Sequence, residues 1–251
     1  MQIALAVIGG SGLYRFEGLQ EQERHRLETP YGEPSADVVT GLLDGQRLAF
    51  LARHGEQHSI APHRINYRAN VYALHALGAR RVLAVNAVGG IRSDLGPRSL
   101  VVPDQIIDYT HGRLSSFCDV PGAKVEHVDF TQPYSEPLRQ MLLAAGRRSA
   151  IGLVDGACYG VVQGPRLETA AEVLRFRRDG CALIGMTAMP EAVLARELGM
   201  EYAGLAMVAN WAAGLEPGGA AIEVEEIFRI LAECTAQLPA LIRALLALVK
   251  D

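Results

Sequence analysis

The stretch Val82-Leu-Ala-Val-Asn-Ala-Val-Gly-Gly90 is the part of the chain from which the fold can be predicted most directly. Its near-continuous apolar run is typical of a strand that is buried on both faces of a sheet. Asn86 interrupts the run near its end, and Gly89 and Gly90 allow the chain to turn and its backbone to approach a ligand. Because ligands of open α/β sheets bind at the carboxyl ends of the strands, the stretch predicts the floor of a small-molecule site. A central strand with an ordinary glycine turn is the alternative that the stretch leaves open.

The composition is that of a globular protein with a sizeable core. The 251 residues are 49% hydrophobic and 21% charged, and a chain of this length is predicted to form a single domain over residues 1–251. The net charge of -4 and the lack of a basic block argue against a nucleic-acid or acidic-membrane partner. No apolar stretch approaches the ~20 residues of a membrane span, and the first residues lack the positive charge of a signal peptide. The four cysteines lie far apart and form no C-x-x-C, so we expect a reduced, cytoplasmic protein.

Short apolar runs alternate with amphipathic segments along the chain. From residue 158 onward the order is strand, helix, strand, helix, strand, helix, which is typical of a largely parallel sheet with helices on both faces. We therefore expect an α/β fold in which a twisted, mostly parallel or mixed central sheet is flanked by helices. The expected strands are 3–8, 38–43, 47–52, 82–90, 100–107, 158–162, 181–185 and 202–209, and the expected helices are 66–78, 135–147, 168–179, 190–199 and 223 to the carboxyl end.

Polar residues directly follow several of these strands. Because the carboxyl ends of the strands meet at one crevice, we expect these residues to lie together, although each alone could be a cap or a turn. The Gly9-Gly10-Ser11-Gly12 segment lacks the spacing of a dinucleotide or Walker loop, yet its backbone N–H groups can form an anion-binding nest. With no Ser-His-Asp order and no metal-binding cluster, the set supports positioning and electrostatic stabilisation of an anion beside a neutral heterocycle. The residues are Ser11, Arg53, His54, Asn86, Glu168, Thr187 and Asn210.

Six motifs, in order, resemble those of the trimeric purine nucleoside phosphorylase and methylthioadenosine phosphorylase family, and together they cover nearly the whole chain. They are Ile8-Gly-Gly-Ser-Gly-Leu13, Leu51-Ala-Arg-His-Gly55 with His58, Asn66-Tyr67-x-Ala-Asn70, Asn86-Ala-x-Gly-Gly90, Gly164-Pro-Arg-x-Glu-Thr169 and Gly185-Met-Thr-x-Met-Pro-Glu191. The resemblance implies a single-domain α/β fold, a homotrimer, and phosphorolysis of an N-glycosidic bond. Inorganic phosphate would be the co-substrate, without a metal ion or an organic cofactor.

Carried over position by position, the resemblance also implies the parts of the site. The phosphate groups would be Ser11, Arg53, His54, the backbone at Ala87, and Thr187. Met186 would lie under the ribose, and the purine would be surrounded by Asn86, Leu167, Glu168 and Asn210. His127 matches a residue that reaches into the neighbouring subunit's site. Phosphate would attack C1′ as the C–N bond lengthens, with the implied catalytic groups being Arg53, His54 and Asn210.

Two positions predict which base the site selects. This chain has Glu168 and Asn210 where methylthioadenosine phosphorylases carry Ser and Asp, and the pair resembles that of family members for 6-oxopurines. The Asn210 amide can donate to O6 or N7, and the Glu168 carboxylate can accept from N1–H. Adenine reverses both polarities, because its N6 is a donor and its N1 an acceptor. The pair therefore predicts a 6-oxopurine base.

The 5′ end of the nucleoside is expected against Val224, Ile227 and Phe228, which share one helix face at i, i+3, i+4 spacing. Val224 stands where family members for inosine and guanosine place a histidine, so the face favours a methylthio group over a hydroxyl; a stripe that only packs in the core is the alternative. Together with Glu168 and Asn210, which select the base, this apolar face predicts phosphorolysis of S-methyl-5′-thioinosine to hypoxanthine in purine salvage. Alternative substrates are inosine or guanosine and methylthioadenosine, and the competing classes are a metal-dependent nucleoside hydrolase and a non-catalytic nucleoside-binding protein.

Overall fold

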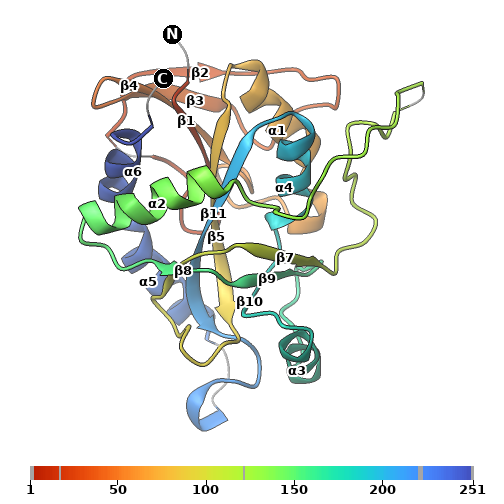
Figure 1. The fold of residues 1–251 in the computed structure, drawn as a ribbon, viewed down its shortest axis with the longest axis vertical. Helices are drawn as coiled ribbons and strands as arrows, with labels where there is room; N and C mark the ends of the chain where they lie inside the picture. The colour runs from red at the N-terminus through yellow and green to blue at the C-terminus, as the bar shows by residue number, and fades with distance from the viewer. Residues whose placement is uncertain (1–2, 17, 121, 220–222, 250–251) are drawn as a thin grey trace.

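A computed structural model describes residues 3–16, 18–120, 122–219 and 223–249. These residues form an eleven-stranded mixed sheet with helices packed on both faces (Figure 1), which confirms the predicted α/β class. The strands are β1 (Leu5–Gly9), β2 (Gln20–His25), β3 (Val38–Leu43), β4 (Gln46–Ala52), β5 (Arg81–Gly90), β6 (Leu100–Val102), β7 (Gln105–Asp108), β8 (Val154–Asp155), β9 (Cys158–Val161), β10 (Leu183–Gly185) and β11 (Glu201–Trp211). The α-helices are α1 (Tyr67–Ala76), α2 (Glu136–Arg148), α3 (Ala170–Arg178), α4 (Ala188–Glu197), α5 (Val224–Thr235) and α6 (Leu238–Leu246).

Strand β5 is the strand predicted from residues 82–90, and it lies at the centre of the sheet. It runs parallel to β1 on one side, with Ala6 opposite Val82, and parallel to β11 on the other, with Tyr202 opposite Val82. At its carboxyl end it also pairs antiparallel with β10. The ends of β1, β4, β5 and β11 therefore point the same way, because β4 is parallel to β1.

Gly89 and Gly90 continue β5 and do not turn the chain, so the predicted glycine turn is wrong. A Cβ atom on Gly90 would lie 2.0 Å from the carbonyl oxygen of Leu95, and one on Gly89 would lie 3.2 Å from the Ile184 side chain. The glycines are needed because other segments approach the backbone closely where β5, β10 and β11 meet.

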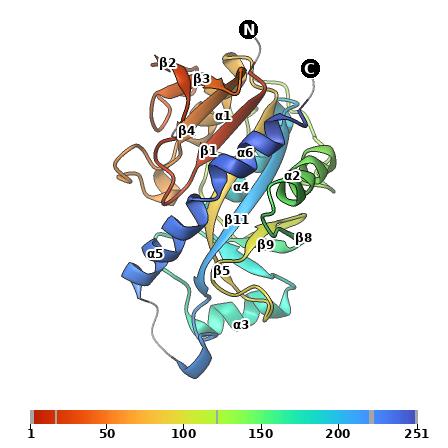
Figure 2. The same cartoon turned by 90° about the vertical axis from the view of Figure 1, so that its left-hand side faces the viewer.

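Two apolar cores hold the helices against the sheet. On one face, α1 and α4 contribute Leu74 and Leu194 to the first core. On the other face, α2, α5 and α6 contribute Leu142, Leu231 and Ile242 to the second. Figure 2 shows α5 and α6 lying across β1 and β11, on the face that α2 also covers. A smaller cluster packs the inner side of α3.

Polar caps start three of the predicted helices. The Asn66 side chain accepts a hydrogen bond from the Ala69 N–H at 3.1 Å at the start of α1. Ser135 caps α2, and Thr169 forms a reciprocal capping box with Glu172 at the start of α3. Such caps satisfy N–H groups that the first turn of a helix leaves unpaired.

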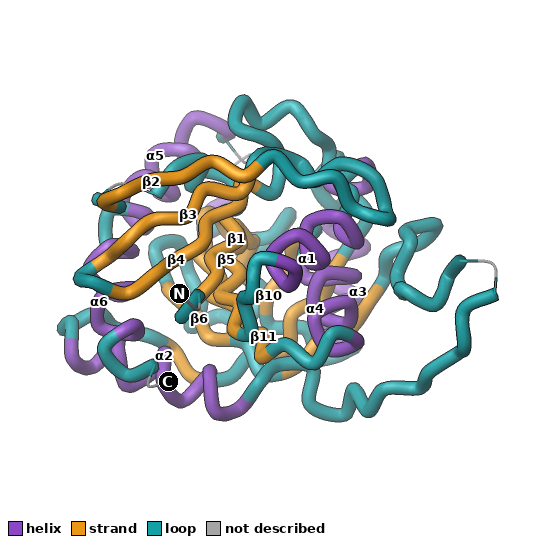
Figure 3. The backbone as a smooth tube through the Cα atoms, turned by 90° about the horizontal axis from the view of Figure 1, so that it is seen from above, coloured by secondary structure: helices purple, strands orange, loops and turns teal. Residues whose placement is uncertain are grey.

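The prediction of one strand over residues 100–107 is wrong. Pro103 has no N–H for a sheet ladder, and the segment divides there into β6 and β7, which pair with different strands. Strands β2 and β8 were not predicted: β2 is almost wholly exposed and has no apolar alternation, and β8 has two residues. The chain between β7 and α2 forms a long loop, and Figure 3 shows it projecting from the body of the protein.

Candidate active site

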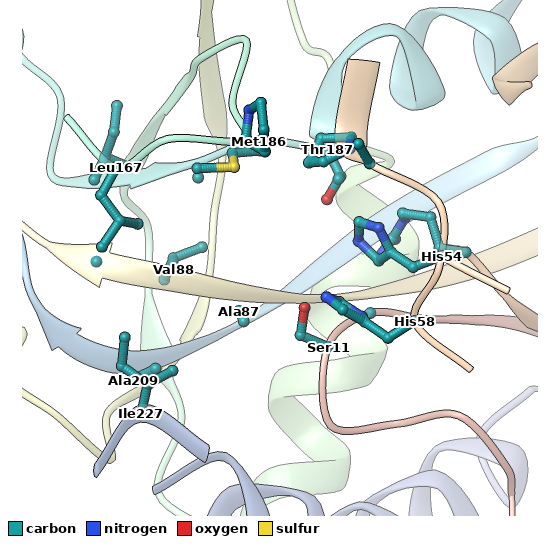
Figure 4. A pocket seen from close by; sticks show the side chains of 18 of the residues that line it. Ser11, His54, His58, Ala87, Val88, Leu167, Met186, Thr187, Ala209 and Ile227 are labelled. Carbon is teal, nitrogen blue, oxygen red and sulfur yellow. The ribbon is translucent and has the colours of Figure 1, made fainter. Parts of the chain in front are cut away.

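A cavity of about 410 Å³ opens where β1, β4, β5, β10 and β11 end. The predicted site residues that line it are Ser11, Arg53, His54, Ala87, Leu167, Glu168, Met186, Thr187, Asn210 and Ile227. Figure 4 shows that they fall into two groups: Ser11, His54 and Thr187 lie at one end, and Leu167, Met186 and Ile227 at the other. The sheet thus brings together residues from five separate strand ends, as the prediction of a shared crevice required.

Thr187 offers a hydroxyl donor at the polar end of the cavity. It is the N-cap of α4, yet its side chain makes no capping hydrogen bond. The Nδ2 of Asn86 donates to Thr187 Oγ1 at 2.9 Å, which leaves the hydroxyl hydrogen of Thr187 available to an anion. Asn86 itself is buried and does not line the cavity, so its contact with the site runs through Thr187.

Arg53 is fully buried at the polar end and forms a bidentate ion pair that the motifs did not reveal. Its Nε and Nη2 donate to the two carboxylate oxygens of Glu191 at 2.7 and 2.8 Å, and Nη1 donates to the carbonyl of Val85 at 2.8 Å. Burial alone would lower the pKa of Arg53, but the Glu191 carboxylate outweighs it and raises the pKa above its ordinary value. Glu191 is also fully buried and accepts from the Tyr202 hydroxyl at 2.9 Å. A guanidinium has five N–H groups, so Arg53 keeps donors for a ligand while its orientation is held.

His54 is a neutral imidazole at the same end. Burial, followed by the charge of Arg53, lowers its pKa to about 4. Its Nδ1 lies 2.8 Å from the carbonyl oxygen of Ile60, which can only accept, so Nδ1 carries the proton and Nε2 is the free lone pair. The ring of His58 lies 4.8 Å from that of His54, between centroids, and it also lines the cavity. His58 was quoted within a motif, but the predicted site did not include it.

Glu168 and Asn210 also line the cavity, directly after Leu167 and Ala209 in the chain. Burial raises the pKa of the Glu168 carboxyl. Arg166, two residues away, binds Glu172 at 2.7 and 2.8 Å, so within the described chain Glu168 has no basic partner within ion-pair distance. Asn210 lies within β11, immediately after a register shift, and its Nδ2 donates to the Trp211 carbonyl at 2.6 Å. One N–H and the carbonyl oxygen of that amide remain for a ligand.

Besides Asn86, three predicted residues lie outside the cavity: His127, Val224 and Phe228. Val224 and Phe228 are 55% and 47% exposed, so of the predicted apolar face only Ile227 reaches the cavity. His127 is exposed on the projecting loop. Among the described residues, no three His, Cys, Asp or Glu side chains are grouped to hold a metal ion. None of the described helices is both long and apolar enough to cross a membrane.

A mixed α/β sheet whose strand ends gather anion donors beside a crevice of heterocycle size forms the class of site that can bind an anion next to a planar heterocycle. Comparisons with known proteins agree with this class. The family described as Phosphorylase superfamily matches residues 4–247. The chain belongs to this superfamily and is a purine nucleoside phosphorylase, a pentosyltransferase.

Individual relatives differ in their substrates. A protein of Xanthomonas campestris pv. campestris named "Probable S-methyl-5'-thioinosine phosphorylase" is 59% identical over 212 residues, which are 84% of this chain and 85% of the relative. The 6-oxopurine nucleoside phosphorylase of Pyrococcus furiosus is 40% identical over 250 residues, which are 98% of this chain and 92% of the relative. A solved methylthioadenosine phosphorylase from an antarctic soil metagenomic library superposes with a TM-score of 0.91 at 37% identity. The match covers 99% of this chain and 86% of that structure's chain.

Proposed function

We propose that this chain cleaves S-methyl-5′-thioinosine with inorganic phosphate, releasing hypoxanthine and 5-methylthioribose 1-phosphate in purine salvage. The observation that carries this proposal is that Glu168 and Asn210 both line the cavity. They follow Leu167 and Ala209 in the chain, which lie at the end away from Ser11 and Thr187 (Figure 4). Glu168 is free to accept from N1–H of a 6-oxopurine, and Asn210 can donate to O6 or N7. Adenine would set its N1 lone pair against the carboxylate, an unpaired polar contact that costs on the order of a few kcal/mol.

Phosphate is proposed to bind at the polar end, between the Gly10–Ser11 turn, Arg53 and the Thr187 hydroxyl, with the Ala87 backbone beside it. Phosphate attacks C1′ while the glycosidic bond lengthens, and its negative charge stabilises the oxocarbenium-like sugar. The purine leaves with negative charge that the Asn210 amide stabilises by hydrogen bonding. No metal or organic cofactor is part of this proposal, and inorganic phosphate is a co-substrate. His54, being neutral with a free Nε2, accepts a hydrogen bond from the hydroxyl of hydrogen phosphate in this arrangement.

The 5′-methylthio group is proposed to lie against Ile227 and the start of α5. Val224 and Phe228 leave apolar surface exposed on the isolated chain, and a neighbouring subunit of a homotrimer would cover it and bring its own His127 to the site. We propose that residues 1–251 act as one nucleoside phosphorylase domain of such a trimer in the cytoplasm. Sedimentation at assay concentration should then give a trimer, and a fully active monomer would contradict this part of the proposal.

The substrate is tested by kcat/KM of the wild-type protein for three nucleosides at saturating phosphate. We expect methylthioinosine to be cleaved faster than inosine, because an apolar 5′ pocket leaves a hydroxyl unpaired, and methylthioadenosine to be cleaved poorly, because Glu168 opposes its N1. Preference for methylthioadenosine would contradict the role of Glu168 and Asn210. Preference for inosine over methylthioinosine would contradict the proposed methylthio pocket, but it would leave the role of Glu168 and Asn210 intact.

The Val224→His variant should be compared with the wild type in the same kcat/KM assay. A histidine at this position can donate to a 5′-hydroxyl, so the ratio of inosine to methylthioinosine cleavage should rise. The ratio of methylthioinosine to methylthioadenosine cleavage should stay constant, because the change lies away from the base. An unchanged inosine ratio would show that Val224 does not contact the 5′ substituent.

A further inference from the structure

Arg113 connects the projecting loop to two sides of the active-site cavity. It lies in the projecting loop between β7 and α2. Its Nη1 donates to the carbonyls of Met186 and Met189 at 2.8 and 2.6 Å. Its Nη2 donates to the carbonyls of Gln163 and Val162 at 2.9 and 3.3 Å. One guanidinium therefore binds four backbone carbonyls on two segments that are more than twenty residues apart in the chain.

The remaining contacts of Arg113 fix the plane of its guanidinium. Its Nε donates to Gln163 Oε1 at 3.2 Å, Nη1 lies 3.2 Å from the Tyr67 hydroxyl, and the guanidinium carbon lies 5.5 Å from the centre of the Tyr67 ring. None of the Asp or Glu side chains in the described ranges pairs with it. An ion-pair role would require a carboxylate partner, whereas the partners of Arg113 are mainly backbone carbonyls. Arg113 therefore joins chain segments to one another.

The two segments that Arg113 binds lead to side chains at both ends of the cavity. Val162 and Gln163 follow β9 and lead to Leu167 and Glu168, on the proposed base side. The Met186 side chain lies at the same end as Leu167, but the carbonyls of Met186 and Met189 flank Thr187, which lies on the proposed phosphate side. Met189 lies in the first turn of α4 with extended backbone angles (φ -115, ψ 137), so its carbonyl is turned out of the helical pattern.

We propose that Arg113 is a positioning residue for phosphorolysis, which holds the base side and the phosphate side of the cavity at a fixed separation. This inference rests on the proposed function for the identity of the two sides. In the transition state, phosphate and purine lie on opposite sides of C1′, so their separation decides whether attack and departure can coincide. A misplacement of about 1 Å at such a site costs roughly 10²-fold in rate.

Lysine cannot replace Arg113 in this role. Its ammonium presents three donors from one point, whereas the four carbonyls lie around a planar fork of N–H groups. The structure also provides a matched control: Arg68, on α1, donates to the Asp119 carbonyl of the same loop at 3.3 Å and lies 5.1 Å from the Tyr31 ring centre. Arg68 makes a similar loop contact without binding either cavity segment.

The test compares Arg113→Met, Arg113→Lys and Arg68→Met with the wild type. At saturating phosphate and nucleoside, using whichever purine nucleoside the wild type cleaves best, kcat per folded protein should fall roughly 10- to 100-fold in both Arg113 variants. It should stay within about twofold in Arg68→Met. Wild-type kcat in Arg113→Met, or rescue of kcat by Arg113→Lys, would overturn the proposal, because the first indicates a purely structural role and the second a role of charge alone.

Hydrogen exchange of the unliganded proteins tests the same inference without a substrate, so it is independent of the proposed function. Amide exchange over residues 162–168 and 185–190 should accelerate together in Arg113→Lys, which keeps the stem and charge of the native residue. In Arg68→Met neither segment should change. Acceleration confined to the loop before α2, or to one of the two segments, would overturn the proposal.

Discussion

Arg53→Ala is expected to lower both the stability of the fold and kcat/KM for phosphate, and it is the most damaging single change predicted here. The substitution leaves the Glu191 carboxylate, which is fully buried, without its cation. Breaking a buried ion pair from one side costs about 3–5 kcal/mol of unfolding free energy. Loss of a charge-assisted hydrogen bond to phosphate adds roughly 1.5–3 kcal/mol to the barrier, or roughly a 10- to 150-fold loss of kcat/KM.

The double variant Arg53→Met with Glu191→Met separates these two effects. Replacing both members of a buried ion pair by apolar residues of similar volume is often neutral for stability, so this variant should unfold near the wild type. It should nevertheless show the same loss in kcat/KM for phosphate as the single variant. Chemical unfolding and initial rates at varied phosphate are the measurements. A double variant with the wild-type KM for phosphate would show that the guanidinium does not bind it.

Asn210→Asp is expected to weaken turnover of 6-oxopurine nucleosides by roughly 10²-fold or more, the scale of one mismatched buried polar contact. A carboxylate at this position would place an acceptor opposite O6, which is itself an acceptor. It would also lose the 2.6 Å hydrogen bond that the Asn210 amide donates to the Trp211 carbonyl, and two oxygens would then face each other. kcat/KM for methylthioinosine, with thermal unfolding as the check on folding, measures the effect.

The companion change Glu168→Ser distinguishes base recognition from a general loss of activity. Asn210→Asp alone should not give full adenine activity, because Glu168 still opposes N1 of adenine. The double variant should cleave methylthioadenosine better than either single variant. If Asn210→Asp keeps wild-type activity on methylthioinosine, the assignment of Asn210 to the base is wrong.

The central strand and the helix starts could be predicted because their signals are local. An apolar run such as residues 82–88 and an N-cap such as Asn66 depend on neighbours in the chain. Strand β2 could not be predicted, since its exposed polar residues are ordered only by pairing with β3. The turn expected at Gly89 and Gly90 was wrong, because the close approach that requires glycine involves Leu95 and Ile184, although Gly89 does line the cavity.

The composition of the cavity followed from the motifs, but the contacts behind its surface did not. Glu191 stands in a quoted motif, yet only the fold shows that it holds Arg53 by two hydrogen bonds. Asn86 was expected to touch the base, and the structure shows it donating to Thr187. Arg113 lies in a segment with no distinctive pattern, and its partners are backbone carbonyls, which leave no mark in the sequence.

The most direct test of the account measures hypoxanthine release from S-methyl-5′-thioinosine with and without inorganic phosphate, and identifies the sugar product. The arrangement of Ser11, Arg53 and Thr187 at one end of the cavity predicts that release requires phosphate. Hypoxanthine and 5-methylthioribose 1-phosphate should then appear in equal amounts. Equal release of hypoxanthine in phosphate-free buffer, with free 5-methylthioribose as the product, would contradict the account.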